Sequence, residues 1–169
     1  LDIVPLLETV DDLKNGPEII KSLIENEPYS NHLAVRQNKQ TVMIGYSDSN
    51  KDSGIASARW ALQEAQIALA KAAVTHKFDL FLFHGRGGTI SRGGGKTNAA
   101  VLGSPPGTIN GYLRVTEQGE IINEKYGLRG IALRTLEQAA SSVALASAIP
   151  QYQKTDMPEW QTLMQVIAE

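Results

Sequence analysis

The stretch that decides the fold is Phe78-Asp-Leu-Phe-Leu-Phe83, which runs directly into His84-Gly-Arg-Gly-Gly-Thr-Ile-Ser-Arg-Gly-Gly-Gly-Lys96. The first part is short, apolar and aromatic, which predicts a buried strand. The glycines of the second part allow positive φ angles and a close approach of a ligand to the backbone. A strand that leads into such a loop is how α/β proteins present N–H groups and cations to an anion. We therefore expect an α/β protein with its functional site at this loop.

The polar side chains of the loop suit an anionic substrate. Arg86 and Arg92 can each offer a planar guanidinium group to phosphate or carboxylate oxygens. His84 can transfer a proton near neutral pH. The loop matches neither a Walker A motif nor a dinucleotide-binding motif, because Ile90 occupies a position where each requires glycine. Two alternatives are an RGG-type RNA-binding segment, which would lack the preceding strand, and a plain surface loop, which would not need these cations.

The composition limits the class of protein. The 169 residues are 42% hydrophobic and 20% charged, as is typical of a globular domain, and the net charge of -2 provides no general attraction for nucleic acid. The absence of cysteine excludes disulfides and thiolate metal sites and fits a cytoplasmic protein. No apolar run is long enough to cross a bilayer, so no membrane partner is expected. The chain starts at Leu1 and ends inside a predicted helix, which indicates a piece of a longer protein.

Strand and helix patterns alternate along the chain, which predicts a parallel sheet with crossover helices. Asp11 or Asp12 is expected to cap the first helix. The helix predicted over 54–76 carries two apolar stripes, a core stripe that begins at Ile55 and a second one formed by Trp60, Ile67 and Val74. Strands are expected at 2–8, 40–46, 78–83 and 112–116, and helices near 17–25, 30–37, 54–76, 97–102, 120–126, 131–148 and 160–168.

Polar residues follow each predicted strand, where parallel sheets gather their chemistry. These residues are Glu8, Asp48, His84 and Glu117. Two carboxylates suit Mg²⁺ or Mn²⁺, and with the arginines and Lys51 they indicate metal-dependent chemistry on a small phosphorylated acid. Each residue also has an ordinary interpretation: the carboxylates as helix caps, the histidine as a buried hydrogen-bonded group, and the arginines as solvated side chains.

Two long segments, 42–54 and 83–95, resemble the signature segments of the phosphoenolpyruvate carboxylase family. The shorter stretches 6–13, 103–107 and 113–120 match the family pattern as well. Ser91 and Lys96 stand where the family commonly has glycine and proline, and neither removes an expected functional group.

The resemblance implies an enzyme, a cytoplasmic homotetramer that converts phosphoenolpyruvate and bicarbonate to oxaloacetate and phosphate. It implies a partial (β/α)8 barrel over residues 1–130, followed by a helical segment over 131–169 that leads into a missing C-terminal region. Because half of a barrel holds half of a site, the isolated piece is expected to be inactive. The alternative is a non-catalytic module that binds phosphate or RNA through the glycine- and arginine-rich loop.

The resemblance also implies roles for individual residues. Glu8 and Asp48 would hold Mg²⁺ or Mn²⁺, with Lys51 near the metal. Arg86 would contact the substrate phosphate, and Arg92 would act in the active-site loop and meet dicarboxylate inhibitors. His84 would act in the carboxyphosphate and CO₂ step.

Overall fold

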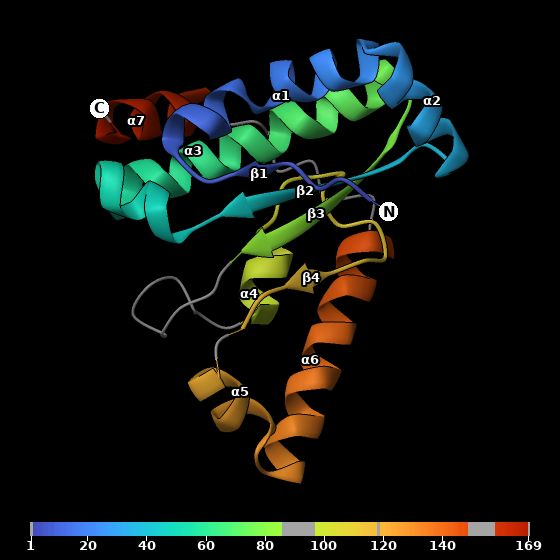
Figure 1. Ribbon diagram of the computed structural model, residues 1–169. Coiled ribbons are helices and arrows are strands. Elements are labelled where there is room, and N and C mark those ends of the chain that lie inside the picture. The colour runs from blue at the N-terminus through green and yellow to red at the C-terminus, as the bar shows by residue number, and fades with distance from the viewer. Residues whose placement is uncertain (1, 86–96, 118, 149–157, 169) are drawn as a thin grey trace.

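A computed structural model describes residues 2–85, 97–117, 119–148 and 158–168, with the backbone alone for 47–53 and 158 (Figure 1). Among these residues, no helix is both long enough and apolar enough to span a membrane. The elements are β1 (Leu6–Leu7), α1 (Val10–Glu25), α2 (Glu27–Val35), β2 (Lys39–Gly45), α3 (Ser47–His76), β3 (Asp79–Gly85), α4 (Thr97–Leu102), β4 (Arg114–Val115), α5 (Gly119–Tyr126), α6 (Arg129–Ala148) and α7 (Pro158–Ala168).

The four strands form one parallel sheet in the order β1-β2-β3-β4, so each strand pairs with the next one along the chain. This confirms the predicted α/β class and parallel sheet. The register places Leu7 beside Ile44, Ile44 beside His84, and His84 beside Val115 in one row across the sheet. Consecutive parallel strands are also the order found in a (β/α)8 barrel. Closure into such a barrel stays a prediction.

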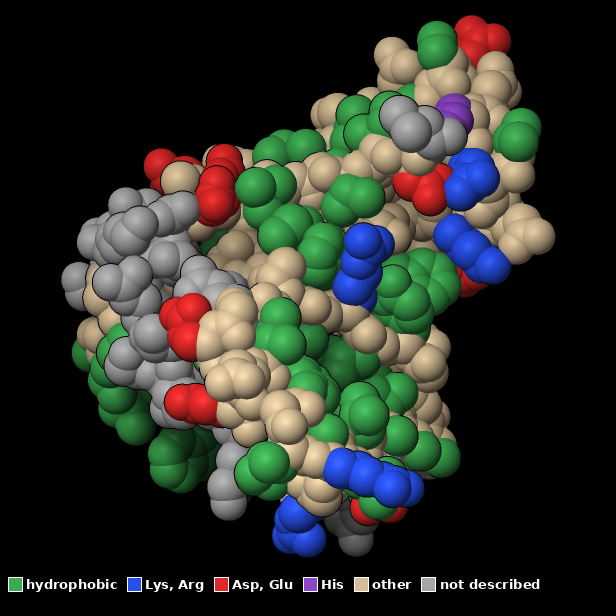
Figure 2. Space-filling view, turned by 60° about the horizontal axis from the view of Figure 1, so that its bottom comes forward, with side chains coloured by type: hydrophobic (Ala, Val, Ile, Leu, Met, Phe, Trp, Pro, Cys, Tyr) green, Lys and Arg blue, Asp and Glu red, His purple; other side chains and the backbone are tan. Residues whose placement is uncertain are grey.

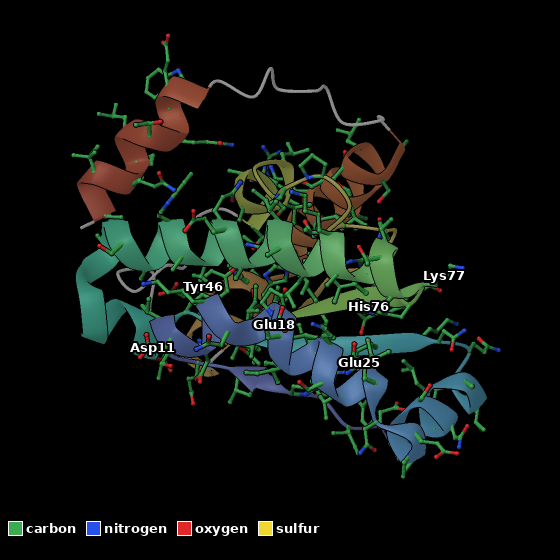
Figure 3. All side chains as sticks on the ribbon, turned by 90° about the horizontal axis from the view of Figure 1, so that it is seen from above. Asp11, Glu18, Glu25, Tyr46, His76 and Lys77 are labelled. Atoms are coloured by element: carbon green, nitrogen blue, oxygen red, sulfur yellow. The ribbon has the colours of Figure 1, made fainter. Side chains whose placement is uncertain are left out.

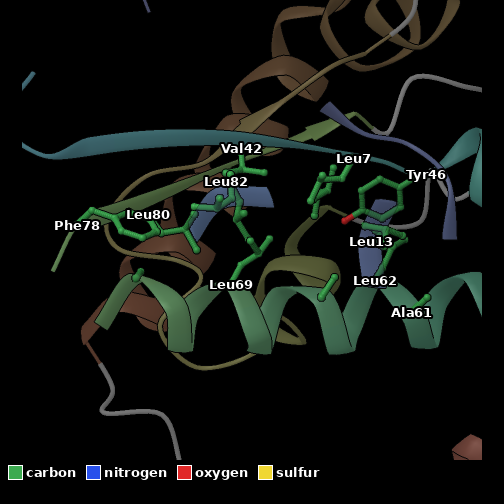
Figure 4. Close-up of a cluster of buried hydrophobic side chains, with 14 of the residues drawn as sticks. Leu7, Leu13, Val42, Tyr46, Ala61, Leu62, Leu69, Phe78, Leu80 and Leu82 are labelled. Carbon is green, nitrogen blue, oxygen red and sulfur yellow. The ribbon is translucent and has the colours of Figure 1, made fainter. Parts of the chain in front are cut away.

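Helices α1 and α3 lie side by side over one face of the sheet, and α7 packs against α3 (Figures 1 and 3). The hydroxyl of Ser57 in α3 donates to the backbone oxygen of Ala168 at 2.7 Å. Helix α4 packs against α6 at the β4 side of the sheet. The main core lies between the sheet and α1 with α3, because alternate strand residues point to that side (Figure 4). Its largest fully buried side chains are Leu7, Leu13, Ile20, Val42, Ile44, Leu62 and Leu69.

Helix α1 begins earlier than predicted because Thr9 caps it. The Thr9 hydroxyl accepts from the backbone N–H of Asp12 at 3.1 Å, and the Asp12 carboxylate accepts from the N–H of Thr9 at 3.0 Å. This reciprocal pair is a capping box. The prediction that Asp11 or Asp12 is the N-cap is therefore wrong, since Asp12 is the third helical residue. Its carboxylate also accepts from the N–H of Glu8 at 3.2 Å, which fixes the backbone at the end of β1.

Helix α3 begins at Ser47 and not at Gly54. Gly54 has a φ of 79° and ψ of 166°, so it forms a kink between a short first segment and the long second one. The core stripe is buried as predicted from Ala58 onward, but Ile55 is exposed because this end of α3 extends past the sheet (Figure 3). In the second stripe, Val74 is 81% exposed and Ile67 is exposed as well.

Three further boundaries differ from prediction. β1 and β4 are only two residues long and lie at the two edges of the sheet, and Pro5, just before β1, has no N–H to donate. Helix α2 starts at Glu27 and not near residue 30, since Asn26 caps it and Pro28 fits its first turn. Hydrophobic side chains are spread over the face of the molecule that Figure 2 shows.

Candidate functional site

The carboxyl ends of the four strands meet at one end of the sheet, as the sequence predicts. Beyond the row that contains His84, the next residues are Glu8, Gly45, Gly85 and Thr116. The N–H of Thr116 donates to the carbonyl oxygen of His84 at 3.0 Å, so the β3–β4 pairing continues to this end. Glu8, His84 and the beginning of α3 therefore lie at the same end of the sheet.

The residues at this end of the sheet are distributed between its two faces. Leu7 and Ile44 share the row of His84 and are buried on the face covered by α1 and α3. A Cβ atom at Gly16 of α1 would come within 2.6 Å of a Leu7 methyl group, which shows how closely the helix covers this face. Glu8 is exposed and follows Leu7, so it belongs to the opposite, open face. The structure thus brings Glu8 and His84 to one end of the sheet but to different faces.

His84 is 5% exposed and forms a pair with Tyr46. The Tyr46 hydroxyl lies 2.8 Å from Nδ1 of His84, and the two ring centres are 6.1 Å apart at an angle of 45°. The guanidinium carbon of Arg59 lies 5.9 Å from the centre of the Tyr46 ring. A cavity of about 20 Å³ adjoins the pair, which is room for about one water molecule and too little for a substrate. Its other lining residues are Thr97, Ala100, Val101, Ser104, Leu113 and Val115.

Glu8 is the described residue best placed to bind a metal ion. Its backbone is fixed by Asp12, and its carboxylate is on the open face. Gly45 lies beside it, where a Cβ atom would come within 3.1 Å of both Cα and Cγ of Glu8. Asp48 is in the first turn of α3, just beyond Gly45, although its side chain lies outside the described part. The carboxylate of Glu8 at the end of β1 fits the preference of Mg²⁺ or Mn²⁺ for oxygen, and among the described residues no group of three His, Cys, Asp or Glu side chains converges.

Glu117, at the end of β4, interacts with α5. Its carboxylate accepts from Nζ of Lys125 at 2.5 Å, and both side chains are partly buried. Burial raises the pKa of Tyr126, and the charge of Glu117 and a hydrogen bond to it raise that pKa further. Glu117 therefore connects β4 to the following helix, away from Glu8.

Sequence reasoning missed two residues of this region. Arg114 lies in the row of Phe83 on the open face, with its guanidinium carbon 4.3 Å from the centre of the Phe83 ring. Arg114 lies between Leu113 and Val115, and alternate residues of a strand point to opposite faces. The sequence could therefore have shown that Arg114 points to the face opposite to these two apolar side chains. The sequence predicts Tyr46 as the end of a strand, and no local signal shows that it contacts His84.

The remaining predicted site residues lie outside the described part. Arg86 and Arg92 fall in the segment 86–96, and Lys51 is in α3 without a described side chain. Their roles stay predictions.

The fold and the strand ends together define an α/β protein with a parallel sheet, whose polar groups gather at the carboxyl ends of the strands. The family model described as phosphoenolpyruvate carboxylase matches residues 1–169. The chain therefore belongs to the phosphoenolpyruvate carboxylase family, as its motifs predict.

Curated relatives that match all or nearly all of this chain are also described as phosphoenolpyruvate carboxylases. The phosphoenolpyruvate carboxylase of Xanthomonas oryzae pv. oryzae is 51% identical over 169 residues, which are 100% of this chain and 19% of that protein. That of Corynebacterium glutamicum is 44% identical over 100% of this chain and 18% of its own length. That of Parasynechococcus marenigrum is 44% identical over 99% of this chain and 17% of its own length. The chain thus spans about a fifth of the length of these relatives.

Proposed function

We propose that the full-length protein containing this chain carboxylates phosphoenolpyruvate with bicarbonate, giving oxaloacetate and inorganic phosphate. The family match over all 169 residues carries this proposal. The position of Glu8 and His84 at the carboxyl ends of parallel strands supports it, because enzymes of this class place their chemistry there.

The reaction requires charge to be stabilised on phosphate and enolate oxygens. A bicarbonate oxygen attacks phosphorus, and the bond from phosphorus to the enol oxygen breaks, leaving carboxyphosphate and an enolate. Carboxyphosphate then releases CO₂ and phosphate, and the enolate carbon bonds to CO₂. In this proposal Arg86 and Arg92 bind the anionic groups, and His84 acts at the carboxyphosphate and CO₂ step.

Mg²⁺ or Mn²⁺, held by Glu8 and Asp48 with Lys51 nearby, would supply positive charge to the phosphate and enolate oxygens. The chain's own contribution is to position these carboxylates. Asp12 holds the backbone of Glu8 through a hydrogen bond, and Gly45 leaves space beside it. Arg114 adds a cation to the same open face.

The assembly is also a proposal. The open face and the two short edge strands, β1 and β4, would be covered by the other strands of a (β/α)8 barrel in the full-length protein. The family likeness further suggests a homotetramer and a dicarboxylate inhibitor that binds near Arg92. The isolated chain would then be inactive, because the rest of the site lies elsewhere in the protein.

The test is bicarbonate-dependent release of phosphate from phosphoenolpyruvate by the full-length protein. Arg86→Ala should lower the rate by about 10²–10³-fold, the usual effect of removing one group that stabilises developing charge. Arg36→Ala is the control, since Arg36 pairs with Asp2 at 2.6 Å near the amino ends of the strands. The absence of bicarbonate-dependent release would contradict the proposal. If RNA binding that weakens steeply with salt were found instead, the RNA-binding alternative would be favoured.

A further inference from the structure

The pair formed by Tyr46 and His84 joins two segments that the sequence assigns to the site. Tyr46 directly follows β2 and precedes α3, whose first turn contains Asp48. His84 is the last residue but one of β3, which leads to the segment 86–96. One hydrogen bond of 2.8 Å therefore connects the residue after β2 to the carboxyl end of β3.

Both members of the pair are held in place by burial. Tyr46 is 8% exposed and belongs to the main core together with Leu7 and Leu13 (Figure 4). His84 is buried in the row between Ile44 and Val115. A hydrogen bond between buried groups is costly to break, because water cannot easily replace either partner. The orientation of the imidazole ring is therefore coupled to the position of Tyr46.

The direction of the hydrogen bond follows from acidity. A phenol, with a pKa of about 10, is a stronger donor than the N–H group of a neutral imidazole. The Arg59 guanidinium lies 5.9 Å from the centre of the Tyr46 ring and draws electron density toward itself, which makes the phenol a better donor still. The hydroxyl should therefore donate to Nδ1, and the proton of neutral His84 is then on Nε2.

We propose that Tyr46 is a positioning residue of the carboxylase and acts through His84. By donating to Nδ1 it fixes the tautomer of His84 and the direction in which the ring presents its Nε2–H group. His84 then presents Nε2–H as a hydrogen-bond donor, and the cavity of about 20 Å³ beside it has room for one water molecule that can bridge from His84 to an anion. This inference rests on the function proposed above. It adds Tyr46 to the residues that serve the reaction and assigns the tautomer of His84.

The kinetic test uses Tyr46→Phe, which removes only the hydroxyl from the full-length protein. We expect kcat for bicarbonate-dependent phosphate release to fall about tenfold, with KM for phosphoenolpyruvate changed less than about twofold, because the lost interaction acts on the chemical step. His84→Asn and the double variant complete a cycle. The double variant should be no slower than His84→Asn alone, since Tyr46 acts through the histidine.

Tyr29→Phe is the matched control. The Tyr29 hydroxyl donates to the amide oxygen of Gln40 at 2.6 Å near the amino end of β2, so this change also removes a hydrogen-bonded hydroxyl beside the same strand. It should lower Tm and leave kcat unchanged. If Tyr46→Phe lowered Tm in the same way with kcat unchanged, Tyr46 would be only structural and the proposal would be overturned. Independent, multiplying effects of the two changes in the cycle would overturn it too.

A spectroscopic test separates this inference from the proposed function. In the full-length protein labelled with ¹⁵N-histidine, the signals missing from His84→Asn identify His84. An unprotonated Nδ1 and a protonated Nε2 are expected at neutral pH, with a shifted Nδ1 signal in Tyr46→Phe. A protonated Nδ1 would overturn the proposal. This measurement needs no activity, so a protein that lacks carboxylase activity would contradict the proposed function while the hydrogen bond is still tested.

Discussion

Replacing Gly45 with alanine should impair the enzyme by moving Glu8. The new Cβ atom would lie 3.1 Å from Cα and Cγ of Glu8 and 3.4 Å from the carbonyl oxygen of Leu7. Carbon atoms ordinarily approach to about 3.5–4.0 Å, so β1 must shift by about 0.5 Å. Overpacking of this kind costs about 1–3 kcal/mol of stability. Since misplacing a catalytic group by 1 Å costs about 10²-fold, a shift half as large should lower kcat/KM about tenfold.

The assay is bicarbonate-dependent phosphate release by the full-length protein over a range of Mg²⁺ concentrations. Gly45→Ala should need more Mg²⁺ for half-maximal activity, because a displaced Glu8 would bind the ion less well. Gly130→Ala in α6 is the control, since no described atom beyond its chain neighbours and its own helix backbone lies within 4 Å of the added Cβ. It should stabilise the protein by about 0.4–1 kcal/mol without changing activity. Wild-type activity and Mg²⁺ dependence in Gly45→Ala would refute the placement of Glu8 at the metal.

Two further predictions concern stability and are read from thermal unfolding of the full-length protein. Leu69→Ala removes a fully buried side chain of α3 and should lower the free energy of unfolding by about 2–5 kcal/mol. Leu128→Ala, at an exposed position, is the control and should change it by less than about 0.5 kcal/mol. Equal effects of the two changes would contradict the described core. Hydrogen bonds from the backbone and side chain of Thr9 and the backbone of Glu8 lower the pKa of Asp12 below 3.8. Its stabilising effect is therefore complete above pH 3.8 and is lost as the pH falls through the lowered pKa. Asp12→Ala should cost about 0.3–1 kcal/mol at neutral pH, the usual effect of an acidic side chain in the first turn of a helix, and should weaken the acid dependence of stability; an unchanged acid dependence would contradict the capping box.

The sheet could be predicted from the sequence because its signals are local. Short apolar runs at 40–46 and 78–83 are separated by a long amphipathic helix, and this alternation requires parallel strands. The core stripe from Ala58 to Ala73 could be predicted for the same reason, since its apolar residues recur at the spacing of an α-helix. The family motifs then indicated the type of site.

What could not be predicted depends on contacts between distant parts of the chain. The hydrogen bond between Tyr46 and His84 joins two strands, so neither local stretch reveals it. The face on which His84 lies depends on where β3 begins and how it pairs with β2, and a shift of one residue would have moved the ring to the open face. The kink at Gly54 replaced an expected helix start, because glycine permits a positive φ between two helical segments.

The pairing of each strand with the next has a consequence for the order of assembly during synthesis. β2 can pair with β1, and β3 with β2, as soon as each has been made, without waiting for a later part of the chain. Each pairing closes a crossover of about 30 residues, which costs less entropy than pairing strands that lie further apart in the sequence. This segment can therefore grow strand by strand from its N-terminal end while the ribosome is still making the rest of the protein. At each stage the newest strand is the edge to which the next one is added.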